Sequence, residues 1–494
     1  MSIATVAQAT VIAVPLILCT GGFVVRYAAK LCSFKSTPSQ SGLARVGWIT
    51  LALSYYAAAM GSWVVSAAPH IGGRAGVIGV VGYGFACALP LLLLTALGPV
   101  VLKLSRKADS HNTTISNNPD RRPFLPLDLV SSSLKVYITS VSIFYMWVFL
   151  ASELQTVGSS MMILADDMPV LRSVTPVAVV AFASLVLQEC RTGRNTSPFF
   201  GHSIQGITCA LLAVFAVSAS LHRGAESSSE NVHAVPDPDL GASLMCMTTF
   251  TISIALAELL NQAEWQRVWA SENTAELRKA LILASGLIWA TVSGFSLVGL
   301  IARRVGSHDD PSCDDQGSYN NCTFYGAFSR SMESDILRNL AAVIVVCLAY
   351  STVHALLFAI HGATAGIFST SCKGSMSRLL VTLIMLMSAC AVAITQAIPI
   401  VALFLMGNFV AATVSGPFFI GTVSRVKCSL SSAVWTGSIA SLLTGLGLCF
   451  AFRPFGGSIL TPLEDMEHWH SLAIFGSVCL SGLLVTKAIM LASQ

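Results

Sequence analysis

The chain has 494 residues, of which 54% are hydrophobic and only 11% are charged, and its formal net charge is +4. A soluble domain carries about 25% charged residues, so this composition excludes an ordinary soluble protein. The small net charge gives no reason to expect a nucleic-acid partner. The sequence also contains no Walker-type or other glycine-rich phosphate loop, which argues against a nucleotide-binding domain.

Apolar segments, most of them about 20 residues long, recur along the whole chain. Because the backbone must satisfy its own hydrogen bonds in lipid, long apolar segments indicate helices. The sequence therefore predicts an all-α polytopic membrane protein with about 13 transmembrane helices. In chain order we expect them at 9–27, 48–67, 75–102, 132–160, 170–189, 204–221, 243–262, 279–301, 337–360, 379–397, 400–422, 431–452 and 469–491.

The first apolar segment has two interpretations, a secretory signal peptide or a retained helix. A signal peptide carries its basic residues ahead of the apolar core. Here no basic residue precedes the segment, whereas Arg26 and Lys30 follow it. We therefore favour a retained helix whose N-terminus lies outside.

The basic residues of the connecting loops fit this orientation. Predicted cytoplasmic loops carry Lys103, Arg106, Lys107, Arg121, Arg122, Arg191, Arg194, Arg267, Arg278, Lys279, Lys373, Arg378, Arg425 and Lys427. Predicted outer loops are acidic, with clusters at 166–167, 226–239, 309–315 and 464–467. Since the bias of Lys and Arg orients helices, we expect the N-terminus outside, the C-terminus in the cytoplasm, and the plasma membrane as the location.

The outer loop after the eighth segment carries two further features. Cys313 and Cys322 lie in it and are either paired in a disulfide or present as two free thiols. Asn321-Cys322-Thr323 is a glycosylation sequon on the side that can be modified, which predicts a glycoprotein.

Several polar residues fall inside the apolar segments, where they are costly and thus candidates for function. Their common alternative role is a structural hydrogen bond between helices. They are Glu153 in the fourth segment, Glu258 in the seventh with Asn261, Gln262 and Glu264 after it, and His354 in the ninth with Ser351 and Thr352 before it and His361 at its end.

Two segments suggest irregular backbone. The stretch 54–63 of the second segment is dense in small residues and contains Gly61. Such a stretch permits close helix packing, or it unwinds at the midplane and frees carbonyl groups to bind a cation. Gly407-Asn408 is expected to interrupt the eleventh segment in a similar way.

The string Asn261-Gln262-Ala263-Glu264-Trp265-Gln266-Arg267 is the most specific motif in the chain. It resembles the Asp-Gln-x-x-Trp-Gln-Arg element after the seventh span of the sodium:solute symporter family, especially its urea- and proline-transporter-like branches. It falls at the right helix, and thirteen predicted spans match the family's layout. The segment 48–102 also looks like the family's first two core helices.

The resemblance implies a five-plus-five inverted-repeat core. Residues 1–30 would form an extra N-terminal helix, 48–221 the first five-helix repeat, 243–424 the second, inverted repeat, and 431–494 two C-terminal helices. It also implies a sodium ion, bound by the backbone carbonyls of Ala57 and Met60 and by the hydroxyls of Ser351 and Thr352. Against this, a helical hydroxyl often bonds only to the carbonyl one turn earlier.

The sequence departs from the family pattern at three places. Asn261 replaces the usual Asp, and His202 stands where an acidic residue precedes the fifth core helix. The segment 353–356 after Thr352 is less rich in hydroxyl groups than usual. These departures leave proton coupling open, because histidine titrates near physiological pH.

The resemblance predicts a secondary active transporter that couples sodium to the symport of a small polar solute, such as urea, an amino acid like proline, or a sugar, by alternating access. We expect the solute to contact Ser62, Trp63, Tyr145, Glu153, Glu258, Gln262 and Asn408. The alternative is a proton-coupled or non-transporting relative that acts as a membrane sensor or scaffold. An enzyme is disfavoured because no acidic partner is expected near His354 and His361, and a channel because no repeated filter motif occurs.

Overall fold

The computed structural model describes residues 3–31, 46–111, 131–165, 168–191, 203, 205–214, 217–218, 238–304, 335–365, 367, 372–396, 398–423, 430–454, 458, 461–464 and 468–492. These residues are almost all helical, and among them the β-type pairing consists of one isolated parallel bridge between Val46 and Ser271. His202, Cys313, Asn321 and Cys322 lie outside the described residues, so the predictions made for them stay predictions.

The helices are α1 (Ile3–Leu31), α2 (Trp48–Ala59), α3 (Trp63–His111), α4 (Ser132–Leu164), α5 (Val170–Arg191), α7 (Leu240–Glu258), α8 (Gln262–Ala270), α9 (Thr274–Arg304), α11 (Asp335–Thr364), α12 (Cys372–Thr395), α13 (Ile400–Val423), α14 (Leu430–Phe452), α15 (Thr461–Glu464) and α16 (Trp469–Ala492). Ten helices in the described part are long and apolar enough to cross a membrane, and Val6–Thr20 and Gln205–Val214 are shorter apolar helices. The predicted fold class is confirmed: this is an all-α, multi-pass membrane protein.

Helix α3 contains the second half of one crossing and the whole of the next, and the two meet at Gly76. This glycine has φ +62° and ψ −147°, a backbone conformation that residues with a Cβ atom rarely adopt. The part of α3 before Gly76 continues the direction of chain begun by α2, which is too short at 12 residues to span a membrane alone. The part after Gly76 forms the next crossing, as the predicted segments 48–67 and 75–102 require.

Two helices are broken at their middles. The first break, at Met60-Gly61-Ser62, separates α2 from α3, and the second, at 259–261, separates α7 from α8. In the division predicted from the sequence, each broken helix is the first of five, and because five crossings are an odd number, the second set would run through the membrane in the opposite direction. The two sets also pack against each other in matching ways. Helix α4 of the first set contacts α12 of the second, and α5 of the first set contacts α11 of the second. The core is a five-plus-five inverted repeat; the repeat boundaries predicted from the sequence stay predictions.

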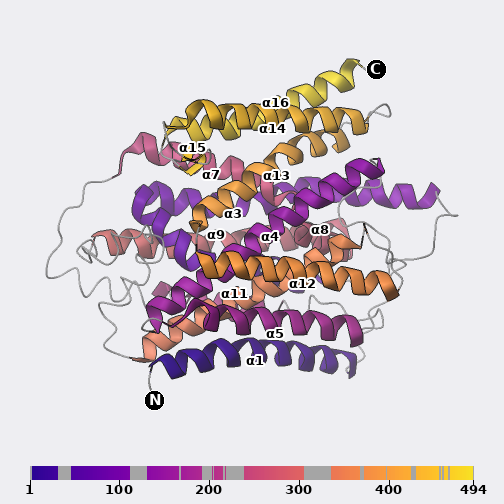
Figure 1. Cartoon of the computed structure of the whole chain (residues 1–494). Coiled ribbons are helices and arrows are strands. Elements are labelled where there is room, and N and C mark those ends of the chain that lie inside the picture. Colours follow the sequence, from indigo (N-terminus) through magenta and orange to yellow (C-terminus); the bar gives the residue numbers. More distant parts are fainter. Residues whose placement is uncertain are drawn as a thin grey trace.

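The remaining helices flank this core. Helix α1 packs against α5 and α11 along one side, and α14 and α16 pack together and against α13 along the opposite side (Figure 1). The N- and C-terminal ends of the chain lie at opposite ends of the helices in Figure 1. Which of these ends faces the cytoplasm stays a prediction.

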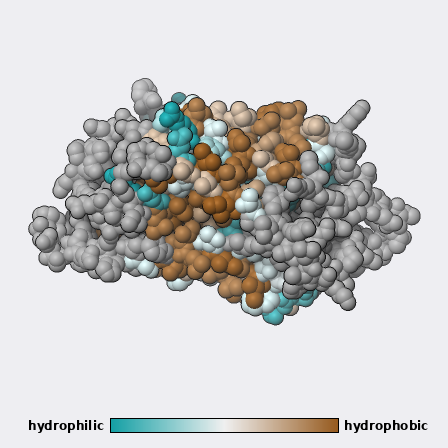
Figure 2. Space-filling model, turned by 90° about the horizontal axis from the view of Figure 1, so that it is seen from below, coloured by the Kyte–Doolittle hydropathy of each residue, from teal (hydrophilic) through white to brown (hydrophobic). Residues whose placement is uncertain are grey.

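The outer surface of the helix bundle is apolar. Large side chains such as Leu211, Val214 and Met376 are more than 60% exposed, although the core beneath them is closely packed. Figure 2 shows brown, hydrophobic side chains across the middle of the view, between the two ends of the helices. A monomer in water rarely exposes such a surface, whereas lipid tails cover it without cost.

One expected irregularity is absent from the described residues. Helix α13 runs unbroken from Ile400 to Val423, so the predicted interruption at Gly407-Asn408 is wrong. A Cβ at Gly407 would come within 2.9 Å of Val148 Cγ1 on α4. The glycine is therefore explained by close helix packing, the other common use of a small residue in a membrane.

Candidate functional site

A central cavity lies between the two helix breaks. Its walls come from α2, α3, α4, α7, α8, α9, α11 and α13, together with Met60 and Asn261 of the breaks themselves. The arrangement places non-helical backbone around a cavity buried in protein, which is where a membrane protein tolerates it.

Aromatic rings form much of the cavity wall. Trp63 meets Tyr83 and Phe404 edge to face, with ring centroids 6.0 and 6.2 Å apart. Tyr83 meets Phe250 at 5.3 Å and Phe149 meets Phe404 at 4.7 Å, again edge to face. These contacts hold the rings in fixed positions, because edge-to-face pairs are favoured at such distances.

Two glutamates and two asparagines supply much of the polarity of the cavity. Glu258, at the end of α7, accepts a hydrogen bond from the Tyr145 hydroxyl at 3.0 Å and another from Asn261 Nδ2 at 2.8 Å. Asn261 also caps α8, because its Oδ1 accepts from the Ala263 amide at 3.1 Å. Glu264 and Asn408 line the same cavity from α8 and α13.

Four polar atoms on cavity-lining residues have no hydrogen-bond partner although they are buried. They are Trp63 Nε1, Glu264 Oε2, Thr352 Oγ1 and Asn408 Oδ1. The residues that carry them are at most 7% exposed. Buried polar groups are normally paired, so a group of unpaired atoms around one cavity indicates a place for a bound molecule, ion or water.

The first helix break is occupied by a carboxyl group of the protein itself. Glu153 Oε2 on α4 accepts hydrogen bonds from the Ser62 amide at 2.7 Å and from the Ser62 hydroxyl at 2.6 Å. Gly61 is required beside it, because a Cβ there would overlap the Glu153 carboxyl. Glu153 thus accepts a hydrogen bond from a backbone amide that would otherwise have no partner at the start of α3.

The residues expected to bind sodium lie close together. Ser351 Oγ donates to the Ala57 carbonyl at 3.1 Å, although the two residues are 294 positions apart, and lies 3.4 Å from Gln205 Oε1. Thr352 Oγ1 has no partner, and Met60 borders the cavity. Neither hydroxyl shows the bond to its own helix that a merely structural role would predict.

The structure divides the residues expected to contact the solute into two groups. Trp63, Glu258 and Asn408 line the cavity. Tyr145 lies behind Glu258, Ser62 and Glu153 are bonded to each other, and Gln262 is buried in α8 outside the lining. Sequence reasoning missed the aromatic residues Tyr83, Phe149, Phe250 and Phe404, and also Gln205, which reaches Ser351 from the stretch where His202 was expected to matter.

The Trp-Gln-Arg motif joins the two broken helices. Trp265 Nε1 donates to the Leu259 carbonyl at 2.8 Å, which gives a hydrogen-bond partner to a carbonyl group at the C-terminal end of α7. Arg267 Nε donates to the Ser54 carbonyl and hydroxyl on α2, both at 3.1 Å, and its guanidinium lies 5.9 Å from the Tyr55 ring centroid. The bridge between Val46 and Ser271 adds a hydrogen bond from the Val46 amide to the Ala270 carbonyl at 3.1 Å.

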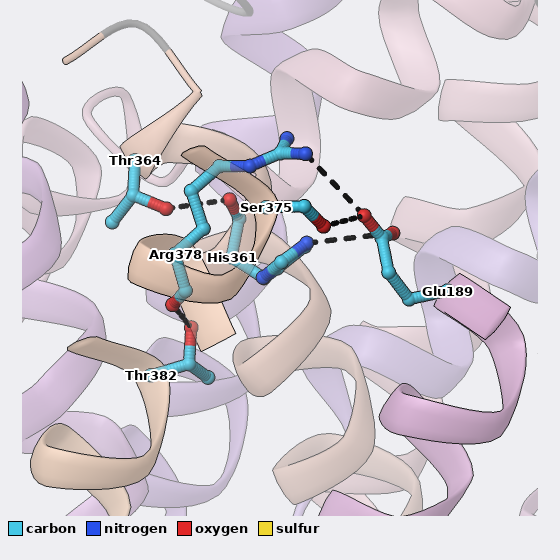
Figure 3. Close-up of polar contacts among 6 residues, drawn as sticks. All are labelled: Glu189, His361, Thr364, Ser375, Arg378 and Thr382. Carbon is cyan, nitrogen blue, oxygen red and sulfur yellow. Dashed lines mark hydrogen bonds and ion pairs between the residues drawn. The ribbon is translucent and has the colours of Figure 1, made fainter. Parts of the chain in front are cut away.

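A second polar cluster lies away from the cavity, where α5 and α11 end and α12 begins (Figure 3). Glu189 Oε1 accepts from Ser375 Oγ at 2.7 Å and from Arg378 Nη2 at 3.3 Å. Its other oxygen, Oε2, lies 3.5 Å from His361 Nε2. The expectation that His361 has no acidic partner is therefore wrong. Sequence reasoning did not single out Glu189, because nothing in the local pattern connects it with His361 and Arg378.

His354 is buried between α5 and α11. Its Nε2 lies 3.3 Å from Ser184 Oγ, and its ring stacks on Tyr350 with centroids 6.0 Å apart. His354 follows Ser351 by one helical turn, so it lies near the residues expected to bind sodium.

Comparison with known proteins supports the fold. No family model and no curated protein matches the sequence. Two solved structures cover most of the chain at 12% identity. One is a Na⁺-coupled sialic acid symporter in a substrate-bound, outward-open state, with a TM-score of 0.63 over 98% of both chains. The other is Mhp1, a nucleobase-cation-symport-1 family transporter, in a closed conformation with bromovinylhydantoin bound, with a TM-score of 0.50 over 91% of this chain and 93% of that one. At this identity the similarity establishes the fold.

Proposed function

We propose that this protein is a secondary transporter that couples sodium to the movement of a small polar solute by alternating access. The observation that carries the proposal is the buried cavity between two broken helices, with unpaired polar atoms in its wall. Broken helices around a buried site are the usual construction of secondary transporters. The two solved structures of similar fold bear the names of a symporter and a transporter, which supports the same function.

In this proposal the sodium ion binds beside the first break. The carbonyls of Ala57 and Met60 and the hydroxyls of Ser351 and Thr352 supply oxygen ligands, which suit a hard cation. The contact between Ser351 Oγ and the Ala57 carbonyl supports the assignment, because it joins α11 to the last turn of α2. Gln205 Oε1 is a further oxygen on the same side of Ser351.

The solute occupies the cavity between Trp63, Glu258 and Asn408. Urea, an amino acid or a sugar is each small and polar enough for such a site, in line with the motif resembling the urea- and proline-transporter branches. The protein works in the plasma membrane with its N-terminus outside, the orientation that the loop charges favour.

Uptake by proteoliposomes tests the proposal. A panel of labelled solutes is offered to the purified full-length chain, with and without an inward sodium gradient. Thr352→Val is expected to raise the sodium concentration for half-maximal uptake several-fold, because one ligand is lost while the shape is kept. The matched control is Thr248→Val: the Thr248 hydroxyl is exposed and bonds to the Leu244 carbonyl of its own helix at 2.8 Å. Equal sodium dependence in both variants contradicts the ion site.

A proton-coupled or non-transporting relative is the second candidate. The observation that favours proton coupling is the buried contact between His354 and Ser184, one turn from Ser351. Uptake that ignores sodium but follows a pH gradient, and is lost in His354→Gln, supports this candidate. A folded protein that binds and transports no solute of the panel supports a sensor or scaffold.

A further inference from the structure

The wall of the central cavity carries carboxyl groups, hydrogen-bond acceptors and one unpaired donor, Trp63 Nε1, but no basic side chain. Glu258 and Glu264 contribute carboxyl groups, and no Lys, Arg or His is among the described residues that line the cavity. Arg267 lies one turn from Glu264 and is near enough to act on it as a positive charge, but its guanidinium is hydrogen-bonded to Ser54 and to the Ala263 carbonyl. A buried carboxylate is stabilised by charges of opposite sign, and the described residues that line the cavity supply none to Glu258 and Glu264.

The place where this architecture could hold an anionic solute is already filled. The start of a half-helix presents free amide groups that can bind the carboxylate of a solute. At the first break the Ser62 amide is bonded to Glu153, and at the second the Ala263 amide is bonded to Asn261. Both are groups of the protein itself, so an acidic solute would meet Glu258 and Glu264 without these amides to compensate.

Two buried acceptor atoms on residues that line the cavity lack donors. Glu264 Oε2 and Asn408 Oδ1 are buried without a hydrogen-bond partner, on residues that are each 3% exposed. They lie on α8 and α13, and both residues line the cavity. A molecule that fits here therefore brings N–H or O–H donors as well as positive charge.

The aromatic wall distinguishes an organic cation from a metal ion. Trp63, Tyr83, Phe149, Phe250 and Phe404 surround the same space, and aromatic faces attract organic cations. A hard divalent ion instead takes about six to eight oxygen ligands, in a largely polar shell. Among the residues that the structure describes, no group of three or more His, Cys, Asp or Glu side chains could hold a metal.

We infer that the solute is a small organic cation with N–H donors, a protonated amine, held between the two carboxyl groups and the aromatic wall. This inference rests on the proposed transport function and names its substrate class. Glu264 and Asn408 accept hydrogen bonds from the ammonium group, Glu258 adds a second negative charge, and Trp63 and its aromatic neighbours enclose the carbon skeleton.

Direct binding tests the substrate class separately from transport. The purified chain in lipid nanodiscs is titrated calorimetrically with ethylamine hydrochloride, urea, acetate and manganese chloride, each in the presence of sodium. Ethylamine is expected to bind most tightly. Glu264→Gln is expected to weaken ethylamine binding about tenfold or more, since a charged hydrogen bond is lost. Asn408→Ala, which keeps both carboxyl groups, is expected to weaken it less.

The matched control is Glu276→Gln on α9, where Glu276 pairs with the exposed Lys279 at 3.0 Å, away from the cavity. It removes the same charge and is expected to leave ethylamine binding unchanged. Tighter binding of urea, acetate or manganese than of ethylamine overturns the inference, and so do equal affinities in Glu264→Gln and Glu276→Gln. Uptake of urea but not of ethylamine overturns the substrate class alone, whereas ethylamine binding without uptake of any solute overturns the transport function alone.

Discussion

Glu189 and Glu264 are both acidic side chains among packed helices, but their surroundings differ. Glu189 has a partner for each oxygen, from Ser375, Arg378 and His361, and the three partners come from two other helices. Glu264 Oε2 has no partner and borders a cavity. A paired carboxylate holds helices together, whereas an unpaired one at a cavity is ready for a ligand. The comparison distinguishes a structural contact between helices from a binding site by two properties together: the polar or charged partners of the carboxyl group, and its place in the cavity lining.

Glu153 belongs with Glu189 in this comparison, although it lies next to the cavity. Its Oε2 is bonded twice to Ser62, across the first helix break, whereas its Oε1 is buried without a partner, as Glu264 Oε2 is. Glu153 thus supports the break through one oxygen, and unlike Glu264 it is not among the residues that line the cavity. Three substitutions can break or sharpen this distinction, each at one of these carboxyl groups or beside it.

Gly61→Val is expected to have the largest effect. Its side chain would overlap the Glu153 carboxyl and push it from Ser62. Overpacking and a displaced buried charge together cost about 3 kcal/mol or more, so little folded protein should remain. The measurement is the yield of monodisperse protein after detergent extraction, with Gly286→Ala as control, because a Cβ at Gly286 meets no atom within 4 Å. A normal yield of Gly61→Val would show that Glu153 does not support the break.

Glu189→Leu is expected to have an intermediate effect. It leaves Arg378 and His361 without their acidic partner where α5, α11 and α12 meet. Because the Glu189 side chain is 33% exposed, the loss is reduced by solvent to about 1–2 kcal/mol. The Tm in detergent should fall while the concentration of solute for half-maximal uptake stays constant. A changed solute concentration for half-maximal uptake with an unchanged Tm would show that Glu189 takes part in binding and not in holding the helices together.

Glu264→Gln is expected to have the smallest effect on stability. The amide keeps the shape of the carboxyl group and removes a buried charge, so the free energy of unfolding should stay constant or rise by up to about 1 kcal/mol. The Tm of the solute-free protein measures this. A fall in Tm as large as that of Glu189→Leu would mean that Glu264 is a structural joint as well, and the comparison between the two regions would fail.

The sequence predicts the helices well because lipid imposes a simple requirement. A segment that crosses the bilayer must be long, apolar and helical, and all three properties are visible locally. The first break was also predicted, since Gly61 lies in a stretch of small residues. The same reasoning failed at Gly407, where the glycine admits Val148 of a neighbouring helix instead of ending α13. A small residue has two uses in a membrane, and only its neighbours in space decide between them.

The cavity was less predictable than the helices. Glu258 and Asn408 stand out in the sequence because polar residues are rare in apolar segments. Tyr83, Phe250 and Phe404 do not, because an aromatic residue is ordinary in such a segment and its local pattern does not show which helix it faces. Gln205 was missed for a similar reason: its relation to Ser351 spans 146 positions and depends on how the two repeats fit together.

The bridge between Val46 and Ser271 has a mechanical consequence. It ties the start of α2 to the end of α8 through main-chain atoms, and the Arg267 contact with Ser54 ties the same two half-helices again farther along. Because both contacts join the two half-helices, we expect a tilt of one to be accompanied by a tilt of the other. A displacement that starts beside Ala57, where the ion is proposed to bind, is then expected to reach Glu264 at the other break.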